Sequence, residues 1–388
     1  MTIFSRNDSY IGLDIGTSSM KLVELKKEGK DALRLVTYAS ASAVNSLMEG
    51  QGEEAVARTA TIVREMARKS SASATNVVVA LPSLSVFSTV VSLPEMNEKD
   101  MEQAINYAAK NYVPSPLEEV VLGWTPIIDK KKVTVTVKEE KGKANEKKQS
   151  EGDPKKEDNK EDDKGDVNRL KERKNMDIFL TAAPKDLVNR YSTVVDRIGL
   201  KLVAMEIESF PLSRSLLKDN PDPVLMVDIG DLATGFSVVE NGYLRINQSI
   251  DMGGRNITES IVTKLGISYE MAEMRKQETG LLSVGQDDSL KMAMSPILRD
   301  IIDKGSNLRY LFERKRKKKI SKVVLIGGGA NLKGLSEFWG EIFGVPAEVG
   351  NPWKGIRIPA VLNDRLRILG PSFAVAVGLA LREFEQSE

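Results

Sequence analysis

One short pattern occurs twice in this chain, each time at the end of an apolar run. Leu-Asp-Ile-Gly occupies 13–16 and Val-Asp-Ile-Gly occupies 227–230, and a turn of small or polar residues follows each copy. Each copy is typical of a buried strand that enters a tight turn and returns as a second strand. One copy alone could be an ordinary turn capped by aspartate, but two copies in equivalent positions indicate an internal repeat. The sequence therefore predicts two similar halves that face each other across a cleft.

The segments around the repeats predict an α/β fold. Apolar runs at 76–81 and 322–326 indicate buried strands. Apolar residues recur at helical spacing over 53–69 and 98–112, and Asn97 can cap the second of these helices. A chain of 388 residues is too long for one ordinary core, so we expect two or more domains.

A highly charged segment separates two strand-like runs at 120–128 and 176–182. Residues 138–174 are almost wholly Lys, Glu, Asp, Asn and Gly. So polar a segment buries too little apolar surface to offset the entropy cost of ordering it. We predict a disordered insertion in a hairpin loop, tolerated rather than functional.

The composition excludes several kinds of chemistry. The chain has no cysteine and no histidine, which rules out disulfides, thiolate or imidazole zinc sites and Ser-His-Asp relays. Its formal net charge is +1, which provides no field for steering nucleic acid, so no nucleic-acid partner is expected. The longest apolar stretch, 368–381, is too short to span a bilayer, and we expect a cytoplasmic protein without a transmembrane segment.

The first repeat carries the groups that bind a triphosphate. A glycine lets the backbone approach a phosphate closely, successive N–H groups form an anion-binding nest, and hydroxyls add donors. The candidate phosphate-binding residues of this turn are Gly16, Thr17, Ser18, Ser19 and Lys21. Asp14 and Asp228, one from each repeat, would face each other and hold Mg²⁺ through waters, as that ion prefers.

The second repeat and a glycine run would complete a nucleotide site. In the second turn the candidates are Gly230 and the hydroxyl of Thr234, whereas Asp231 and Leu232 stand where phosphate donors usually do and could weaken affinity. The strand at 322–326 leads into Gly327, Gly328 and Gly329, a flat surface for a base or ribose. Together these features predict ATP binding.

These residues resemble the actin-like ATPase superfamily, and within it the PilM family of type IV pilus assembly proteins. The similar stretches are 11–25, 112–119, 253–258, 327–335 and 344–353. The resemblance implies an α/β, two-lobed fold of duplicated ribonuclease-H-like domains with an inserted α+β subdomain. It implies a first lobe at 1–74, completed by about 205–220 and a C-terminal helix at 371–388. The inserted subdomain would occupy 75–204 and the second lobe 221–370.

The resemblance also implies further site residues. Gly254 lies in the similar stretch 253–258, and Glu273 and Lys276 match a helix that reaches the ribose and base in the related division protein FtsA. The alternative for that pair is an exposed helical ion pair three residues apart. Glu208, near the connection between the lobes, is the best carboxylate candidate for a catalytic base, although a glutamate at a helix start is common. We expect ATP turnover to be slow or absent.

The leading functional hypothesis is a nucleotide-gated assembly adaptor at the inner face of the cytoplasmic membrane. The family resemblance implies that its partner is the N-terminal cytoplasmic peptide of PilN, bound beside the inserted subdomain. It also implies contacts with other pilus platform proteins and the assembly ATPase, and leaves homo-oligomerisation open.

Two alternatives remain within the same architecture. One is an FtsA-like division protein at the membrane, although 381–388 is acidic and unlike the amphipathic helix typical of that branch. The other is a small-molecule kinase, which would need an acceptor base that the sequence does not offer beyond the two aspartates. The basic run at 314–319 is either a solvated helix end or a contact with anionic lipid.

Overall fold

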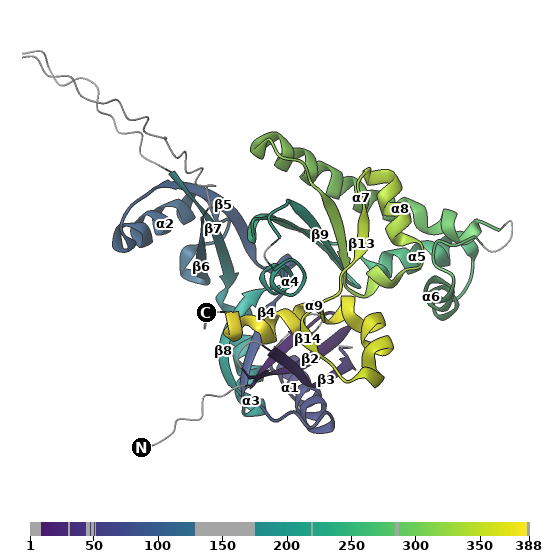
Figure 1. Ribbon diagram of the computed structural model, residues 1–388, viewed down its shortest axis with the longest axis horizontal. Helices are drawn as coiled ribbons and strands as arrows, with labels where there is room; N and C mark the ends of the chain where they lie inside the picture. Colours follow the sequence, from purple (N-terminus) through teal and green to yellow (C-terminus); the bar gives the residue numbers. More distant parts are fainter. Residues whose placement is uncertain are drawn as a thin grey trace, which may run out of the picture.

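The computed structural model describes residues 9–29, 32–43, 47, 50, 52–128, 175–218, 220–283 and 287–385. These residues form two lobes and a smaller subdomain attached to the first lobe (Figure 1). The charged segment 138–174 lies outside the described residues. Its flanking strands pair antiparallel, as a hairpin requires.

The first lobe is built on a six-stranded sheet. The strand order is β14-β3-β2-β1-β4-β8, with antiparallel pairing from β1 to β3 and parallel pairing elsewhere. The strands are β1 (Ser9–Ile15), β2 (Ser19–Glu28), β3 (Ala32–Ser42), β4 (Asn76–Leu81), β8 (Lys201–Ile207) and β14 (Ile356–Arg357). The helices are α1 (Gly52–Lys69), α3 (Lys185–Ile198), α4 (Ser209–Leu216) and α9 (Asn363–Glu385).

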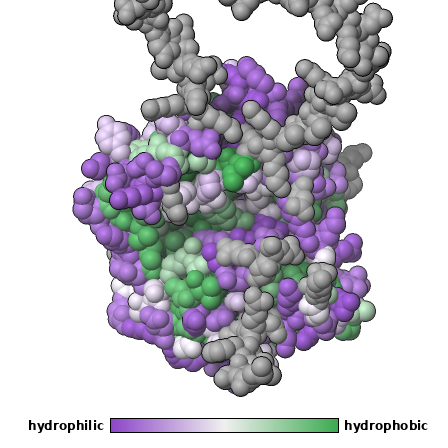
Figure 2. Space-filling view, turned by 60° about the vertical axis from the view of Figure 1, so that its left-hand side comes forward, coloured by the Kyte–Doolittle hydropathy of each residue, from purple (hydrophilic) through white to green (hydrophobic). Residues whose placement is uncertain are grey.

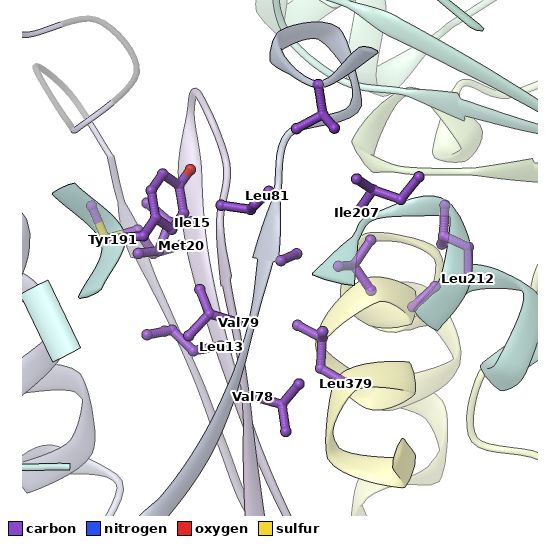
Figure 3. Packing of buried hydrophobic residues seen from close by; sticks show 14 of the residues in the cluster. Leu13, Ile15, Met20, Val78, Val79, Leu81, Tyr191, Ile207, Leu212 and Leu379 are labelled. Carbon is purple, nitrogen blue, oxygen red and sulfur yellow. The ribbon is translucent and has the colours of Figure 1, made fainter. Parts of the chain in front are cut away.

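Helices cover both faces of this sheet. Tyr191 of α3 packs near Ile15 and Met20 on one face, whereas Leu379 of α9 lies beside Val78 on the other (Figure 3). All six residues of β4 are buried, as expected for a central parallel strand between two helical layers.

The second lobe repeats the order of the first. Its sheet runs β11-β10-β9-β12-β13, so that β9, β10 and β12 take the places of β1, β2 and β4. The strands are β9 (Val224–Ile229), β10 (Thr234–Glu240), β11 (Tyr243–Ile250), β12 (Lys322–Ile326) and β13 (Ala347–Val349). The helices are α5 (Gly254–Leu265), α6 (Tyr269–Glu278), α7 (Ser289–Arg316) and α8 (Leu335–Phe343). The predicted internal duplication is therefore confirmed.

The inserted subdomain is smaller than the sequence suggests. Its antiparallel sheet has the order β5-β7-β6, and one helix covers it. The elements are β5 (Phe87–Pro94), α2 (Glu98–Tyr112), β6 (Val120–Ile127) and β7 (Asn175–Pro184). Asn97 caps α2 by accepting the N–H of Asp100 at 3.0 Å, as predicted.

The domain limits drawn from the sequence need correction. The expected subdomain of 75–204 included β4, α3 and β8, but both strands belong to the first lobe, where β4 pairs with β1 and β8. The expected second lobe of 221–370 also ends too late, because β14 pairs with β3 of the first lobe and α9 begins at Asn363. The errors that concern strands share one cause: parallel pairing joins strands that lie far apart in the sequence.

The first lobe brings backbones unusually close together around α9. A Cβ on Gly12 of β1 would lie 1.9 Å from the carbonyl oxygen of Ala376, and one on Gly378 would lie 1.9 Å from that of Pro211 in α4. Glycine therefore lets α9 touch both β1 and α4 directly. In the described part of the chain, no helix is long and apolar enough to cross a bilayer.

Candidate functional site

The two repeated turns open onto one cavity between the lobes. The cavity measures about 630 Å³ and receives residues from both turns, from the loop after β12 and from α6. Of the residues predicted from the sequence, it is lined by Asp14, Gly16, Thr17, Ser18, Ser19, Lys21, Glu208, Asp228, Gly230, Gly254, Glu273, Lys276, Gly327, Gly328 and Gly329. Candidate residues from segments spread over the whole chain therefore line one cavity.

In the first turn, the positively charged side chain of Lys21 lies beside Asp14. Asp14 and Lys21 face each other across the β1–β2 pair, and Lys21 Nζ lies 3.8 Å from Asp14 Oδ2. Lys21 Nζ also donates to the carbonyl oxygen of Ser19 at 3.4 Å, which turns it toward the cavity side of the hairpin. A Cβ on Gly16 would lie 2.9 Å from that same oxygen, so the tight turn requires glycine.

The second turn is tied to the start of α5. The N–H of Gly254 donates to the carbonyl oxygen of Gly230 at 2.8 Å, and the N–H of Arg255 donates to that of Asp231 at 2.9 Å. Arg255 Nη2 also lies 2.8 Å from Asp231 Oδ2. The extra carboxylate of this turn is thus paired with a guanidinium, which reduces the repulsion it would exert on phosphate.

Thr234 does not take part in the cavity, contrary to the prediction. Its side chain is fully buried, and its Oγ1 donates to the carbonyl oxygen of Met252 at 2.7 Å. The residue pairs with Ile229 and Ile250 inside the sheet. Its hydroxyl fixes the segment before α5 instead of facing a ligand.

The glycine run after β12 packs against the second repeat. Gly327 has φ of +78°, and a Cβ there would lie 2.4 Å from Asp228 Oδ1. A Cβ on Gly329 would lie 2.4 Å from Ile229 Cγ2, whereas one on Gly328 would meet nothing within 4 Å. The N–H of Gly327 donates to the carbonyl oxygen of Pro371 in α9 at 3.0 Å. Gly327 and Gly329 therefore pack against Asp228 and Ile229, whereas the space beside Gly328 is open.

Glu273 and Lys276 form part of a hydrogen-bonded cluster rather than an exposed ion pair. Lys276 Nζ lies 2.7 Å from Glu273 Oε2 and donates to Thr258 Oγ1 at 2.7 Å and to the carbonyl oxygen of Gly254 at 3.0 Å. Burial alone would raise the pKa of Glu273, but hydrogen bonds from Lys276, Thr258 and Gln277 hold it below its usual value. This cluster orders the wall of the cavity; its contact with a ribose or base stays a prediction.

Three carboxylates crowd the centre of the site. Burial and the neighbouring charges of Asp228 and Asp14 raise the pKa of Glu208 to about 8. Burial and the charge of Asp14 raise the pKa of Asp228 to about 6, although Lys21 opposes the shift. Burial also raises the pKa of Asp14, again against Lys21. Asp14 and Asp228 therefore bring together negative charge that Lys21 alone does not balance, whereas Glu208 holds its proton at neutral pH.

This excess of negative charge fits a divalent cation. Asp14 and Asp228 offer oxygen ligands, which Mg²⁺ prefers. Within the described residues, no group of three or more Asp or Glu side chains is arranged to hold a metal ion on its own. Water molecules and phosphate oxygens would therefore complete the coordination, as is usual for Mg²⁺ bound with a nucleotide. When bound, the ion would neutralise phosphate charge.

The raised pKa values predict how the nucleotide-free protein responds to pH. Because the folded state holds the proton of Glu208 more tightly than the unfolded chain does, stability should fall as pH rises from the ordinary value of 4.5 to about 8. Glu208→Gln should remove a slope of about 1.4 kcal/mol per pH unit from the middle of this window. Urea unfolding at pH 5 and pH 8 in the presence of EDTA measures the effect.

A matched control separates this effect from general charge removal. Glu341→Gln, at an exposed position on α8, should leave the pH dependence as in the wild type. Parallel pH profiles for wild type and Glu208→Gln would contradict the proposed burial of this carboxyl group.

Several residues of the site were not anticipated from the sequence. The N–H of Ser83 donates to Glu208 Oε2 at 2.8 Å, Arg255 pairs with Asp231, and Thr258 joins the cluster on α6. Ser83 follows Pro82 at the end of β4, so a polar residue at a strand end was its only signal. The other two lie on α5 inside the stretch 253–258 that resembles the family, and that resemblance was the signal that could have found them.

Comparisons with known proteins agree with this architecture. The family model described as type IV pilus assembly protein PilM matches residues 12–138 and 167–384. A solved PilM-PilN type IV pilus biogenesis complex resembles the chain with a TM-score of 0.75 and 25% identity, covering 96% of this chain and 98% of that one.

Cell division proteins are also similar to this chain. FtsA of Neisseria meningitidis serogroup B is 25% identical over 225 residues, which cover 52% of this chain and only 53% of FtsA. FtsA of Streptococcus pneumoniae serotype 2 is 24% identical over 416 residues, which cover 97% of this chain and 80% of FtsA. The predicted actin-like, two-lobed fold is thus confirmed, and the chain belongs to the type IV pilus assembly protein PilM family.

Proposed function

We propose that this protein is an adaptor of the type IV pilus assembly platform that binds Mg-ATP between its lobes and a PilN-type peptide beside its inserted subdomain. One observation carries the nucleotide part: both repeated turns, the glycine loop and two opposed aspartates line the same cavity. Its volume of about 630 Å³ lies within the usual range for small-molecule sites, roughly 300–1,000 Å³.

In this proposal, different residues of the chain bind the phosphates, the cation and the nucleoside. Backbone N–H groups and hydroxyls of residues 16–19 would bind phosphate, with Lys21 as a point charge. Asp14 and Asp228 would hold Mg²⁺ through waters. The loop at 327–329 and the cluster of Glu273 and Lys276 would face the nucleoside. A ligand bound by both lobes would favour the closed arrangement of the lobes.

Hydrolysis would be slow in this arrangement. A general base must be ionised to accept a proton from water. Burial beside Asp228 and Asp14 raises the pKa of Glu208 to about 8, so its carboxyl group holds a proton at neutral pH before a cation enters. We therefore propose that nucleotide binding, and not turnover, sets the state of the adaptor.

The inserted subdomain offers an apolar surface for a peptide. Its exposed large apolar residues are Tyr107, Tyr112, Val121, Trp124 and Ile128. Figure 2 shows hydrophobic side chains gathered in a hollow on the side of the molecule from which this subdomain projects. Val121 lies on β6, an edge strand of the subdomain's sheet, and an edge strand can pair with an extended peptide. The PilM-PilN complex supports PilN as the source of that peptide.

A titration tests the proposed partner. A fluorescein-labelled peptide of the PilN N-terminal segment should bind the purified protein, with an affinity that differs between Mg-ATP and EDTA. Val121→Asp should weaken binding at least about tenfold, or about 1.4 kcal/mol, because it places a charge in an apolar contact. Val361→Asp is the control, since Val361 is 89% exposed and lies outside the inserted subdomain. No binding with or without ATP would rule out this partner.

An FtsA-like role at the membrane is the second candidate, favoured by the FtsA match across 97% of this chain. Co-pelleting with liposomes of anionic lipid, in the absence of any PilN peptide, distinguishes the two. Pelleting that persists without the peptide would favour the FtsA-like role.

A further inference from the structure

A second cavity lies between the inserted subdomain and the second lobe, and it shares no lining residue with the nucleotide cleft. It measures about 530 Å³. Four elements form it: Ser88–Val90 of β5, Asp177 and Phe179 of β7, Arg245–Gln248 of β11 and the last turns of α7. We call it the β5–β11 groove. It also lies at the opposite edge of the inserted sheet from β6.

Two edge strands meet at this groove. β5 ends the three-stranded sheet of the subdomain, and β11 ends the five-stranded sheet of the second lobe. They touch where Asn247 Nδ2 donates to Ser88 Oγ at 3.0 Å and Ser88 Oγ donates to the carbonyl oxygen of Asn247 at 3.4 Å. An edge strand presents backbone N–H and C=O groups to an incoming chain. The groove is therefore suited to an extended peptide.

The wall formed by α7 is strongly basic. Arg314 and Lys315 are exposed and line the groove. Arg316 is fixed, since its guanidinium lies 2.9 Å from Glu240 Oε2 and 3.9 Å from Asp177 Oδ2. Among the described residues that line the groove, Asp177 is the one carboxylate.

A buried carboxylate explains part of the basic run but not all of it. Glu240 is fully buried and also pairs with Arg245, at 3.0 Å, and with Lys318. Arg316 and Lys318 thus have a structural role, whereas Arg314 and Lys315 have exposed side chains on the groove wall. The groove therefore carries more positive than negative charge.

The groove also has an apolar part. Its lining includes Val90, Phe179, Ile246, Leu311 and Phe312. Leu311 is 51% exposed, although it is a large apolar residue. A ligand that satisfied this lining would need apolar groups as well as negative charge.

We propose that the β5–β11 groove binds an acidic segment of a partner protein in extended conformation. The segment adds to the edge of β5, its apolar side chains cover Leu311 and Ile246, and its carboxylates face Arg314 and Lys315. A peptide fits better than a membrane, because the apolar residues and the basic wall lie inside a concave site that a flat bilayer meets only at its rim. This site is separate from the cleft and from the surface proposed for PilN.

A defined probe tests the proposal on the full-length protein. The probe is a fluorescein-labelled seven-residue peptide that alternates glutamate with valine or leucine, and its control has lysine in place of glutamate. Fluorescence anisotropy should show saturable binding of the acidic peptide alone, weakening as salt rises. The double variant R314E/K315E should bind it at least about tenfold more weakly, and Leu311→Ser should weaken it in the same direction.

A matched variant decides whether the groove, and not the general charge, is responsible. K317E/K319E makes the same change in charge at two exposed residues of the same basic run that do not line the groove, and it should bind within about twofold of wild type. Equal losses in the two double variants would overturn the proposal, as would failure of the acidic peptide to bind.

A membrane ligand predicts a different result. Vesicles of phosphatidylglycerol would then bind the protein, displace the acidic peptide and require Lys317 and Lys319 as much as Arg314 and Lys315. That outcome also overturns the proposal. Unchanged binding of the PilN peptide to R314E/K315E would show that the two sites are separate, whichever result the acidic probe gives.

Discussion

Mg-ATP is expected to raise the melting temperature of the wild-type protein, and Asp14→Asn is expected to abolish that rise. A ligand present at 100 times its dissociation constant stabilises the native state by about 2.7 kcal/mol. The substitution removes one of the two charges proposed to hold the cation, so the complex should not form at the same nucleotide concentration. Differential scanning fluorimetry with and without Mg-ATP measures the difference.

The same substitution should not destabilise the nucleotide-free protein. Asp14 is buried, and its charge contributes to the raised pKa values of Asp228 and Glu208. Removing that charge relieves repulsion, so the variant should melt at or above the wild-type temperature in EDTA. Asp364→Asn, on an exposed residue of α9, is the control and should keep the full shift. A full shift in Asp14→Asn would mean that the cation site has been misassigned.

Gly378→Ala is expected to be among the most destabilising single changes in the chain. Its Cβ would lie 1.9 Å from the carbonyl oxygen of Pro211 and 2.4 Å from the carbonyl carbon. Overpacking costs about 1–3 kcal/mol and occasionally more, and here the obstructing atoms are backbone. Alanine regains about 1 kcal/mol of helix propensity over glycine. Because backbone atoms cannot turn aside as a side chain can, we expect the cost at or above the upper end of that range and a net loss of about 2 kcal/mol or more in urea unfolding.

Gly328→Ala is the matched control for this change. A Cβ there would meet nothing within 4 Å, so the free energy of unfolding without nucleotide should change by less than about 0.5 kcal/mol. A similarly small loss in Gly378→Ala would show that α9 and α4 can separate without cost.

Most of the correct fold predictions came from local sequence motifs. Each repeat is a strand, a turn and a returning strand within about twenty residues, so the hairpins β1–β2 and β9–β10 were visible in the letters. The limits of the inserted subdomain were not, because β4 pairs with β8, more than a hundred residues later in the chain. An apolar run indicates a buried strand but does not show which strands pair with it. The strand β3 was missed because most of its residues are only partly buried.

The prediction of site residues was limited because the sequence does not show in which direction each side chain points. Glycines and aspartates at turn ends could be placed, since their backbone position already puts them at the cavity. The prediction that Thr234 faces the cavity was wrong. Successive residues of a strand point to opposite faces, and the hydroxyl of Thr234 faces Met252. The ion pair of Asp231 with Arg255 joins two segments whose approach depends on how α5 begins, which no local pattern records.

The hydrogen bond from Gly327 to Pro371 is one of the links that limit how the two lobes can move. It fastens the glycine loop of the second lobe to α9 of the first at the back of the cleft. An opening motion that keeps this bond would pivot near it, with larger displacements at the turns around Gly16 and Gly230. A nucleoside resting on the loop would lie near the axis of rotation and the phosphates farther out along the lever arm. The number of phosphates, more than the identity of the base, would then control the angle between the lobes.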